Sequence, residues 1–159
     1  MAISEGGAHV RAIISVDGPN GAEEVVLGVD THLDLNVAVA LDSLGRRLGE
    51  LEVPTTRRGH QRLLRWAETE TFGPVGCAGI EGTGSYGAGL VRHLKAAGIS
   101  VTEVERPKRR HLRRRGKSDP IDAEAAARAV LAGEALGEPK SADGKVEMIR
   151  VLRSARRSA

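Results

Sequence analysis

Four carboxylates stand where side chains from distant parts of the chain can meet. Asp30 ends the apolar run VVLGVD, and Glu81 ends the apolar run VGCAGIE. An acid that closes an apolar strand is costly to bury unless a cation or hydrogen bonds compensate for its charge. Asp119 and Asp122 lie three residues apart at the start of a predicted helix, so both carboxylates share one side of its first turn. These positions predict one acidic cluster made of Asp30, Glu81, Asp119 and Asp122.

An all-oxygen cluster of this kind suits Mg²⁺ or Mn²⁺ better than Zn²⁺. Shared carboxylates can hold two dications about 3.5 to 4 Å apart, an arrangement that activates the attacking oxygen and stabilises the leaving oxygen in phosphoryl transfer. We therefore expect a magnesium or manganese cofactor, as a pair of ions, and metal-dependent phosphoryl transfer.

Each acid also has a purely structural interpretation. Asp119 and Asp122 form an Asp-Pro-x-Asp helix start, in which Asp119 caps the helix and Asp122 favours its dipole. Taken alone, this capping role is the commoner one. Asp30 and Asp34 could each cap a turn, and His32 is interpreted as a turn residue and not as a ligand.

Positive charge is concentrated in residues 106–117. This segment holds eight of the 24 Lys and Arg residues and no acid, so the remainder carries 16 bases against 21 acids. A charge of +8 beside the predicted acidic cluster, with −5 elsewhere, favours a polyanionic partner. The alternative is that these charges form a solvated surface without a binding partner. No aromatic residue lies in the segment, so we expect phosphate contacts from its bases, which are Arg106, Lys108, Arg109, Arg110, Arg113, Arg114, Arg115 and Lys117.

The sequence GTGSYG at 82–87 matches G-x-G-x-x-G between a predicted strand and a predicted helix. It has the spacing of a dinucleotide-binding loop, with Glu103 and Glu105 about 20 residues later. Glu81 directly before the loop would place a negative charge near a bound pyrophosphate. A dinucleotide-binding domain therefore stays an alternative, and it requires a parallel sheet with this loop after its first strand. Otherwise the glycines let backbone or phosphate approach Glu81 closely.

The elements that must position these residues follow from the hydrophobic periodicity. Residues 25–30, 35–42 and 48–53 are typical of three strands joined by short turns, which predicts an antiparallel meander. A helix is expected within 55–72, with Thr55 or Thr56 as its N-cap, followed by a strand at 75–81. A second helix from about residue 85 to Gly98, a strand at 99–105 and a helix from Asp119 to Gly133 complete an α/β fold with a mixed sheet and flanking helices.

Composition limits the remaining possibilities. The 159 residues fit one domain, and only three are aromatic, which argues against single-strand binding by a row of stacked rings. Cys77 is the only cysteine and is interpreted as an inert core thiol. There is neither an export signal nor a run of 18 apolar residues, so we expect a cytoplasmic protein without a membrane partner.

Several linked motifs in one order resemble the amino-terminal domain of transposases of the insertion sequence 110 family. They are GVDTHLD, PTTRRGHQRLLRWA, GIEGTGSYGAGLVRHL, EVERPKRR and GKSDPIDAEAAARAVLAG. The resemblance covers residues 25–159 and implies a RuvC-like, ribonuclease H-like fold with a DEDD tetrad. That tetrad falls on Asp30, Glu81, Asp119 and Asp122 in this sequence.

The resemblance also implies a magnesium-dependent DNA recombinase that moves its own element, works as a homo-oligomer and is guided by an element-encoded RNA. It implies a carboxy-terminal domain with a nucleophilic serine, to which no serine here can be assigned. We thus expect a loose arm at 1–24, the catalytic domain at 25–140 and the start of a helical linker at 141–159 in a truncated transposase, unable to complete strand exchange alone. A nucleic-acid-binding remnant without catalytic activity is the other alternative.

Overall fold

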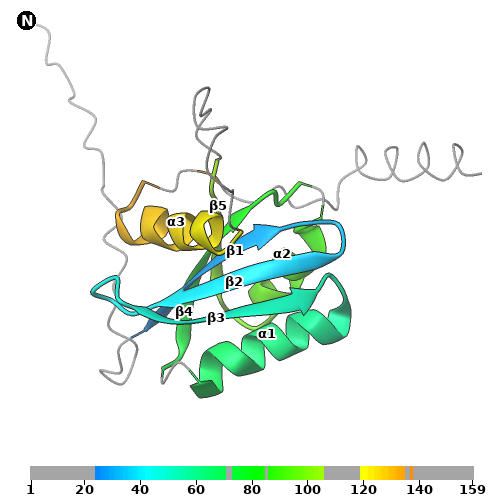
Figure 1. Cartoon of the computed structure of the whole chain (residues 1–159), viewed down its shortest axis with the longest axis horizontal. Coiled ribbons are helices and arrows are strands. Elements are labelled where there is room, and N and C mark those ends of the chain that lie inside the picture. Colours follow the sequence, from blue (N-terminus) through cyan, green and yellow to red (C-terminus); the bar gives the residue numbers. More distant parts are fainter. Residues whose placement is uncertain (1–23, 71–72, 85, 106–118, 135–136, 138–159) are drawn as a thin grey trace, which may run out of the picture.

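A computed structural model of the chain describes residues 24–70, 73–84, 86–105, 119–134 and 137. The order of strands and helices along the sequence is the predicted one (Figure 1). The expected arm and helical linker lie outside the described residues, so these domain boundaries stay predictions. The elements are β1 (Val25–Thr31), β2 (Leu35–Leu41), β3 (Arg47–Pro54), α1 (Arg57–Glu70), β4 (Val75–Glu81), α2 (Ala88–Ala96), β5 (Ser100–Glu103) and α3 (Asp119–Leu131).

The strands form one five-stranded sheet in the order β3-β2-β1-β4-β5. β1 pairs antiparallel with β2, and β2 pairs antiparallel with β3, which confirms the predicted meander. β4 lies parallel to both β1 and β5, and α2 is the crossover helix that joins β4 to β5. The mixed sheet with flanking helices confirms the ribonuclease H-like α/β fold class.

Helices cover both faces of the sheet, with α1 and α2 on one face and α3 on the other (Figure 1). Strand residues alternate between these faces. In β1, Leu27 and Val29 join the larger apolar core on the α1 and α2 side, together with Leu63 and Trp66 of α1. Val26 joins the smaller core under α3. The scarcity of aromatic residues is consistent with cores built mainly from aliphatic side chains.

Local capping explains where the helices begin and end. The Thr56 hydroxyl accepts a hydrogen bond from the backbone N–H of Gly59 at 3.1 Å, so Thr56 is the predicted N-cap of α1. α2 begins at Ala88, later than expected, because Gly82 has a φ of +79° and its carbonyl accepts a bond from the N–H of Gly87 at 3.3 Å. This hydrogen bond closes a turn, and α2 starts only after that turn. Gly133 follows α3 with a φ of +67°, as expected of a residue that ends a helix.

β3 forms one edge of the sheet. Most of its side chains are exposed, including Arg47, Glu50 and Glu52, and Pro54 ends the strand. β2, its neighbour, is buried from Asn36 to Leu41. The meander therefore runs from a charged outer strand to an apolar centre. Within the described residues, no helix is both long enough and apolar enough to cross a membrane.

Candidate metal centre

The carboxyl ends of two neighbouring parallel strands carry the first two predicted acids. Asp30 of β1 and Glu81 of β4 are direct partners in the strand register, so both side chains leave the sheet on the same face. That face is the one beneath α3, because Asp30 lies on the same face of β1 as Val26 and Gly28, which α3 covers. The Thr31 hydroxyl donates a 2.7 Å hydrogen bond to the backbone carbonyl of Glu81, which fixes the two strand ends together.

Two glycines let α3 lie unusually close to the sheet. A Cβ atom at Gly28 would lie 1.9 Å from the carbonyl oxygen of Ala123, and one at Gly79 would lie 2.6 Å from that of Ala126. The side of α3 that faces the strands is made of small residues, which allows the close approach. Ala123, Ala126 and Ala127 are all buried there. Because α3 passes directly over Gly28, its first turn reaches the carboxyl end of β1.

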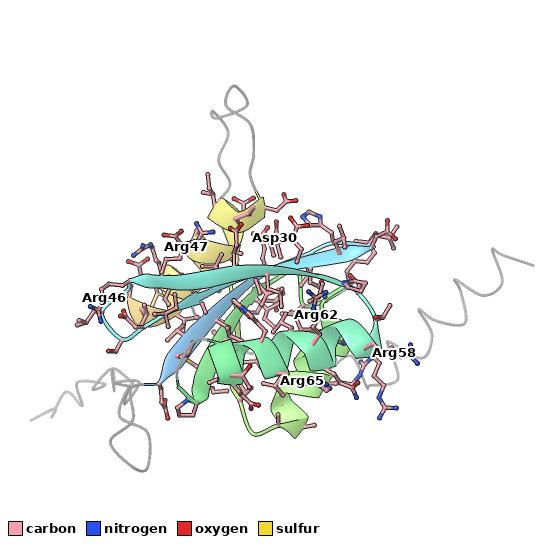
Figure 2. All side chains as sticks on the ribbon, turned by 60° about the horizontal axis from the view of Figure 1, so that its bottom comes forward. Asp30, Arg46, Arg47, Arg58, Arg62 and Arg65 are labelled. Atoms are coloured by element: carbon pink, nitrogen blue, oxygen red, sulfur yellow. The ribbon has the colours of Figure 1, made fainter. Side chains whose placement is uncertain are left out.

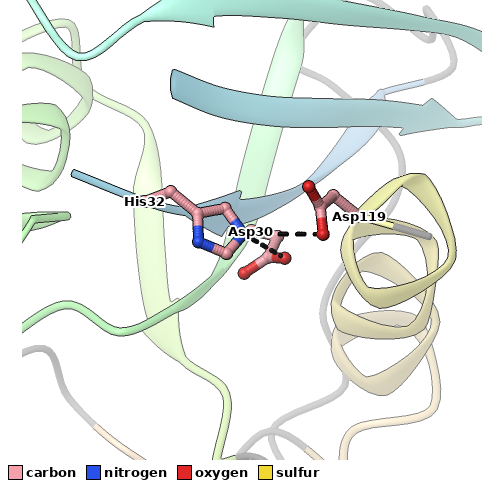
Figure 3. Close-up of side chains that lie close together, drawn as sticks. All are labelled: Asp30, His32 and Asp119. Carbon is pink, nitrogen blue, oxygen red and sulfur yellow. Dashed lines mark hydrogen bonds and ion pairs between the residues drawn. The ribbon is translucent and has the colours of Figure 1, made fainter. Parts of the chain in front are cut away.

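Asp119, at this first turn, joins Asp30 and His32 in one cluster (Figure 3). The His32 Nε2 atom lies 3.0 Å from Asp30 Oδ2 and 3.6 Å from Asp119 Oδ1. One ligand atom from each of the three residues lies within 4.8 Å of the others. The side chain of Asp30 is only 3% exposed, whereas those of His32 and Asp119 are 43% and 45% exposed. The cluster is therefore buried at Asp30 and open to solvent at His32 and Asp119.

Glu81 and Asp122 lie beside this cluster and outside the three-residue group. Both are half-buried. Glu81 neighbours Asp30 across the β1–β4 pairing, and Asp122 stands one helical turn after Asp119. The structure thus brings Asp30 and Asp119 together and sets the other two predicted acids on the adjacent strand and the same helix.

His32 is the member of the cluster that sequence reasoning missed. It does occupy a turn, since its backbone N–H donates to the carbonyl of Leu35 at 3.0 Å. Its imidazole nevertheless points to the two carboxylates, which corrects the interpretation of His32 as a turn residue only (Figure 3). The available signal was its position two residues after Asp30, a spacing that keeps two side chains on the same face where a strand ends.

This arrangement can hold a divalent metal ion. A buried carboxylate next to a second carboxylate is unfavourable unless positive charge lies between them. Two carboxylate oxygens and one imidazole nitrogen converge here, and all are ordinary ligands of divalent cations. Because the site lies outside the carboxyl ends of β1 and β4, it also has the usual location of ligand sites in open α/β sheets.

Sequence comparison now decides the family. Residues 27–159 match the model of the DEDD domain of insertion sequence 110 elements, which is described as a transposase. The chain belongs to this transposase family. Its function class is therefore DNA transposition and recombination.

Comparison with curated proteins and solved structures gives only remote similarities for the transposase domain. No curated protein matches its sequence. RuvC of Thermus thermophilus is 16% identical, with a TM-score of 0.48 over 73% of this chain and 99% of RuvC. A T. thermophilus RuvC in complex with Holliday junction substrate is 15% identical, with a TM-score of 0.49 over 74% of this chain and all of RuvC. A ROK hexokinase from T. thermophilus is 22% identical, with a TM-score of 0.38 over 50% of this chain and 33% of the hexokinase.

The glycine loop of the transposase domain does not meet the requirement of a dinucleotide site. It follows β4, whereas a dinucleotide-binding domain would place it after the first strand of a parallel sheet. Gly82 instead packs close to the Thr31 hydroxyl, where an added Cβ would lie at 2.9 Å. The loop therefore serves to bring the end of β4 against the end of β1, and the dinucleotide alternative is wrong.

Two other predicted features have different outcomes. Cys77 is buried under α3, which confirms that it is a core cysteine. Burial, together with the nearby charge of Glu24, raises the pKa of its thiol to about 11, and its lack of reactivity stays a prediction. The basic segment at 106–117, with all eight of its predicted nucleic-acid-binding residues, lies outside the described residues. Its contact with phosphates stays a prediction.

Proposed function

We propose that this transposase domain catalyses divalent-metal-dependent phosphoryl transfer on DNA. The observation that carries the proposal is the convergence of buried Asp30 with Asp119 and His32 at the carboxyl end of β1. The exposed sides of His32 and Asp119 leave that cluster open to a substrate.

In this proposal, Asp30 and Asp119 are the principal metal ligands, and Glu81 and Asp122 complete an acidic tetrad around a pair of Mg²⁺ or Mn²⁺ ions. Bound metal would supply Lewis-acid stabilisation of the attacking and leaving oxygens. The role of His32 is to orient the Asp30 carboxylate through its Nε2 atom, at 3.0 Å, or to donate that nitrogen to the metal. A nitrogen ligand favours Mn²⁺ over Mg²⁺, since Mg²⁺ prefers oxygen.

DNA is the proposed substrate and is expected to be held by the basic residues of 106–117, which immediately precede Asp119 in sequence. From the family resemblance we also propose an element-encoded guide RNA, a homo-oligomeric working state and a serine nucleophile supplied outside these 159 residues. The 159-residue chain tested alone is then expected to bind DNA and metal without completing strand exchange. Robust recombination by that chain would contradict this last point.

The metal site can be tested by thermal unfolding in the presence of Mn²⁺ and Mg²⁺. A metal that binds only the folded state stabilises it by about 2.7 kcal/mol at 100 times its dissociation constant. Asp30→Asn should abolish this increase, because the buried carboxylate supplies the charge that the metal needs. Asp34→Asn is the matched control, since Asp34 is exposed in the same turn, and it should keep the full response.

The same titration tests His32. His32→Asn should weaken the stabilisation by Mn²⁺ more than that by Mg²⁺. An Asp30→Asn variant with the metal response of the unmodified chain would refute the site. If DNA binding remained salt-dependent while metal had no effect on any variant, the chain would instead be the binding remnant without catalytic activity.

A further inference from the structure

The outer side of α1 carries three arginines in successive turns (Figure 2). Arg58, Arg62 and Arg65 are spaced by four and three residues, so at about 100° per residue they fall within an arc of about 60°. All three are exposed, whereas the buried stripe of α1, with Leu63 and Ala67, faces the sheet. We call Arg58, Arg62 and Arg65 the arginine face.

The arginine face is not neutralised by acids. Among the described residues, no carboxylate forms an ion pair with any of its three guanidinium groups. Three arginines elsewhere in the described sheet and helices do pair with acids, whereas Arg57 and Arg92 resemble the arginine face in having no carboxylate partner among the described residues. Arg46 pairs with Asp42, Arg47 pairs with Glu50 and Glu124, and Arg128 pairs with Glu124.

Helix stability does not account for these charges either. Helices favour acidic residues in the first turn, because the amino-terminal end of the helix dipole is positive. The first turn of α1 contains no acid and instead begins with Arg57 and Arg58. Positive charge from Arg57 and Arg58 at this end costs stability, and a bound anion would compensate for that cost.

The beginning of α1 is attached to the turn that carries the metal centre. The Thr55 hydroxyl donates a 3.0 Å hydrogen bond to the carbonyl of His32, and the Thr55 N–H donates to the carbonyl of Asp34 at 2.9 Å. Arg58 follows Thr55 by three residues, so the arginine face starts near the His32 turn and extends along α1. From Arg58 to Arg65 the helix rises about 10.5 Å.

We propose that the arginine face is a second DNA-binding surface, which contacts the backbone of duplex DNA flanking the strand held at the metal centre. A B-DNA strand presents one phosphate per rise of about 3.4 Å, so the length of the face matches about three phosphates. Bidentate guanidinium groups suit phosphate oxygens well. This inference rests on the proposed function, because it takes DNA as the substrate.

Duplex binding measured over a series of salt concentrations tests the proposal. The triple variant Arg58→Gln, Arg62→Gln, Arg65→Gln should reduce the slope of log affinity against log salt by roughly 2 to 3, at about 0.9 per lost phosphate contact. The control Arg46→Gln, Arg47→Gln, Arg128→Gln removes the same formal charge from positions already paired with acids, and its slope should stay within about one of the unmodified chain. Thermal unfolding confirms that each variant is folded.

Three outcomes would overturn the proposal. The first is an unchanged slope in the arginine-face variant, with DNA binding by the unmodified chain intact, and this leaves the proposed function standing. The second is an equal fall in both variants, which would mean a diffuse charge effect. The third is an arginine-face variant that loses binding to an RNA hairpin but keeps its binding to duplex DNA, which would assign the arginine face to RNA. Absence of any DNA binding by the unmodified chain would instead contradict the proposed function as well.

Discussion

Replacing Gly28 by alanine should lift α3 from the sheet and disassemble the proposed metal centre. The added Cβ would lie 1.9 Å from the carbonyl oxygen of Ala123 and 2.5 Å from the nitrogen of Ala127, while ordinary contact begins at 3.4 Å. The nearer gap must therefore open by about 1.5 Å. Because both atoms belong to the backbone of α3, no side-chain rotation can relieve the clash, and the helix itself must move. Asp119 would move with it, away from Asp30.

We expect Gly28→Ala to lower the free energy of unfolding by about 3 kcal/mol, the upper part of the usual cost of overpacking. That corresponds to a fall in Tm on the order of 10 °C. The rise in Tm caused by Mn²⁺ should also be lost, since the two carboxylates no longer meet. Thermal unfolding with and without Mn²⁺ measures both effects in one experiment.

Substitutions at two other glycines should lower the Tm by smaller amounts, in the order of their steric overlap. Gly79→Ala meets the carbonyl oxygen of Ala126 at 2.6 Å, a smaller overlap, and should cost less. Gly84→Ala meets nothing within 4 Å and should leave the Tm close to that of the unmodified chain. The reasoning would be refuted if Gly28→Ala unfolded at the same temperature as Gly84→Ala and kept the response to Mn²⁺.

Further measurements address the other side of the sheet and the core. Burial, the neighbouring imidazole of His93 (ring centroids 6.1 Å apart) and the charge of Arg92 lower the pKa of His60 below its ordinary value of 6.5. The unfolded chain therefore takes up a proton at a higher pH than the folded chain, and stability should fall as the pH drops below about 6.5. In metal-free buffer, this fall in Tm should be smaller in His60→Phe, and equal falls would contradict the assignment. Thr56→Ala removes the cap of α1 and should cost about 1 kcal/mol in urea unfolding, whereas Thr56→Ser should cost little. Cys77, with its raised pKa of about 11, should resist thiol reagents at pH 8 until the chain is unfolded, and rapid labelling of the folded chain would contradict its burial.

Most of the fold could be predicted from the sequence because its signals are local. Alternation in 25–54, the change to helical periodicity after Thr56 and the Asp-Pro start of α3 each depend on a few neighbouring residues. Asp30 and Glu81 became candidate site residues for the same reason, since each closes an apolar strand sequence. That Asp30 and Glu81 are direct partners in a parallel strand pair was not predicted and is shown by the structure.

The features that escaped prediction depend on contacts between distant residues. The purpose of Gly28 becomes visible only when α3, which begins 91 residues later, lies across β1. The place of His32 in the cluster depends on that same approach, because Asp119 comes from the helix. His32 and Gly28 look like an ordinary turn residue and an ordinary strand glycine in the sequence. Their contribution to the candidate site can be recognised only when α3 is packed on the sheet.

The charged edge strand β3 bears on how copies of this chain can associate. An unpaired strand edge invites another chain to extend the sheet, and natural proteins oppose this with charged side chains and proline at the edge. β3 has these features, with exposed Arg47, Glu50 and Glu52 along its length and Pro54 at its end. A homo-oligomer would therefore be expected to assemble elsewhere than along β3, leaving this edge of each subunit closed to strand exchange with its neighbours.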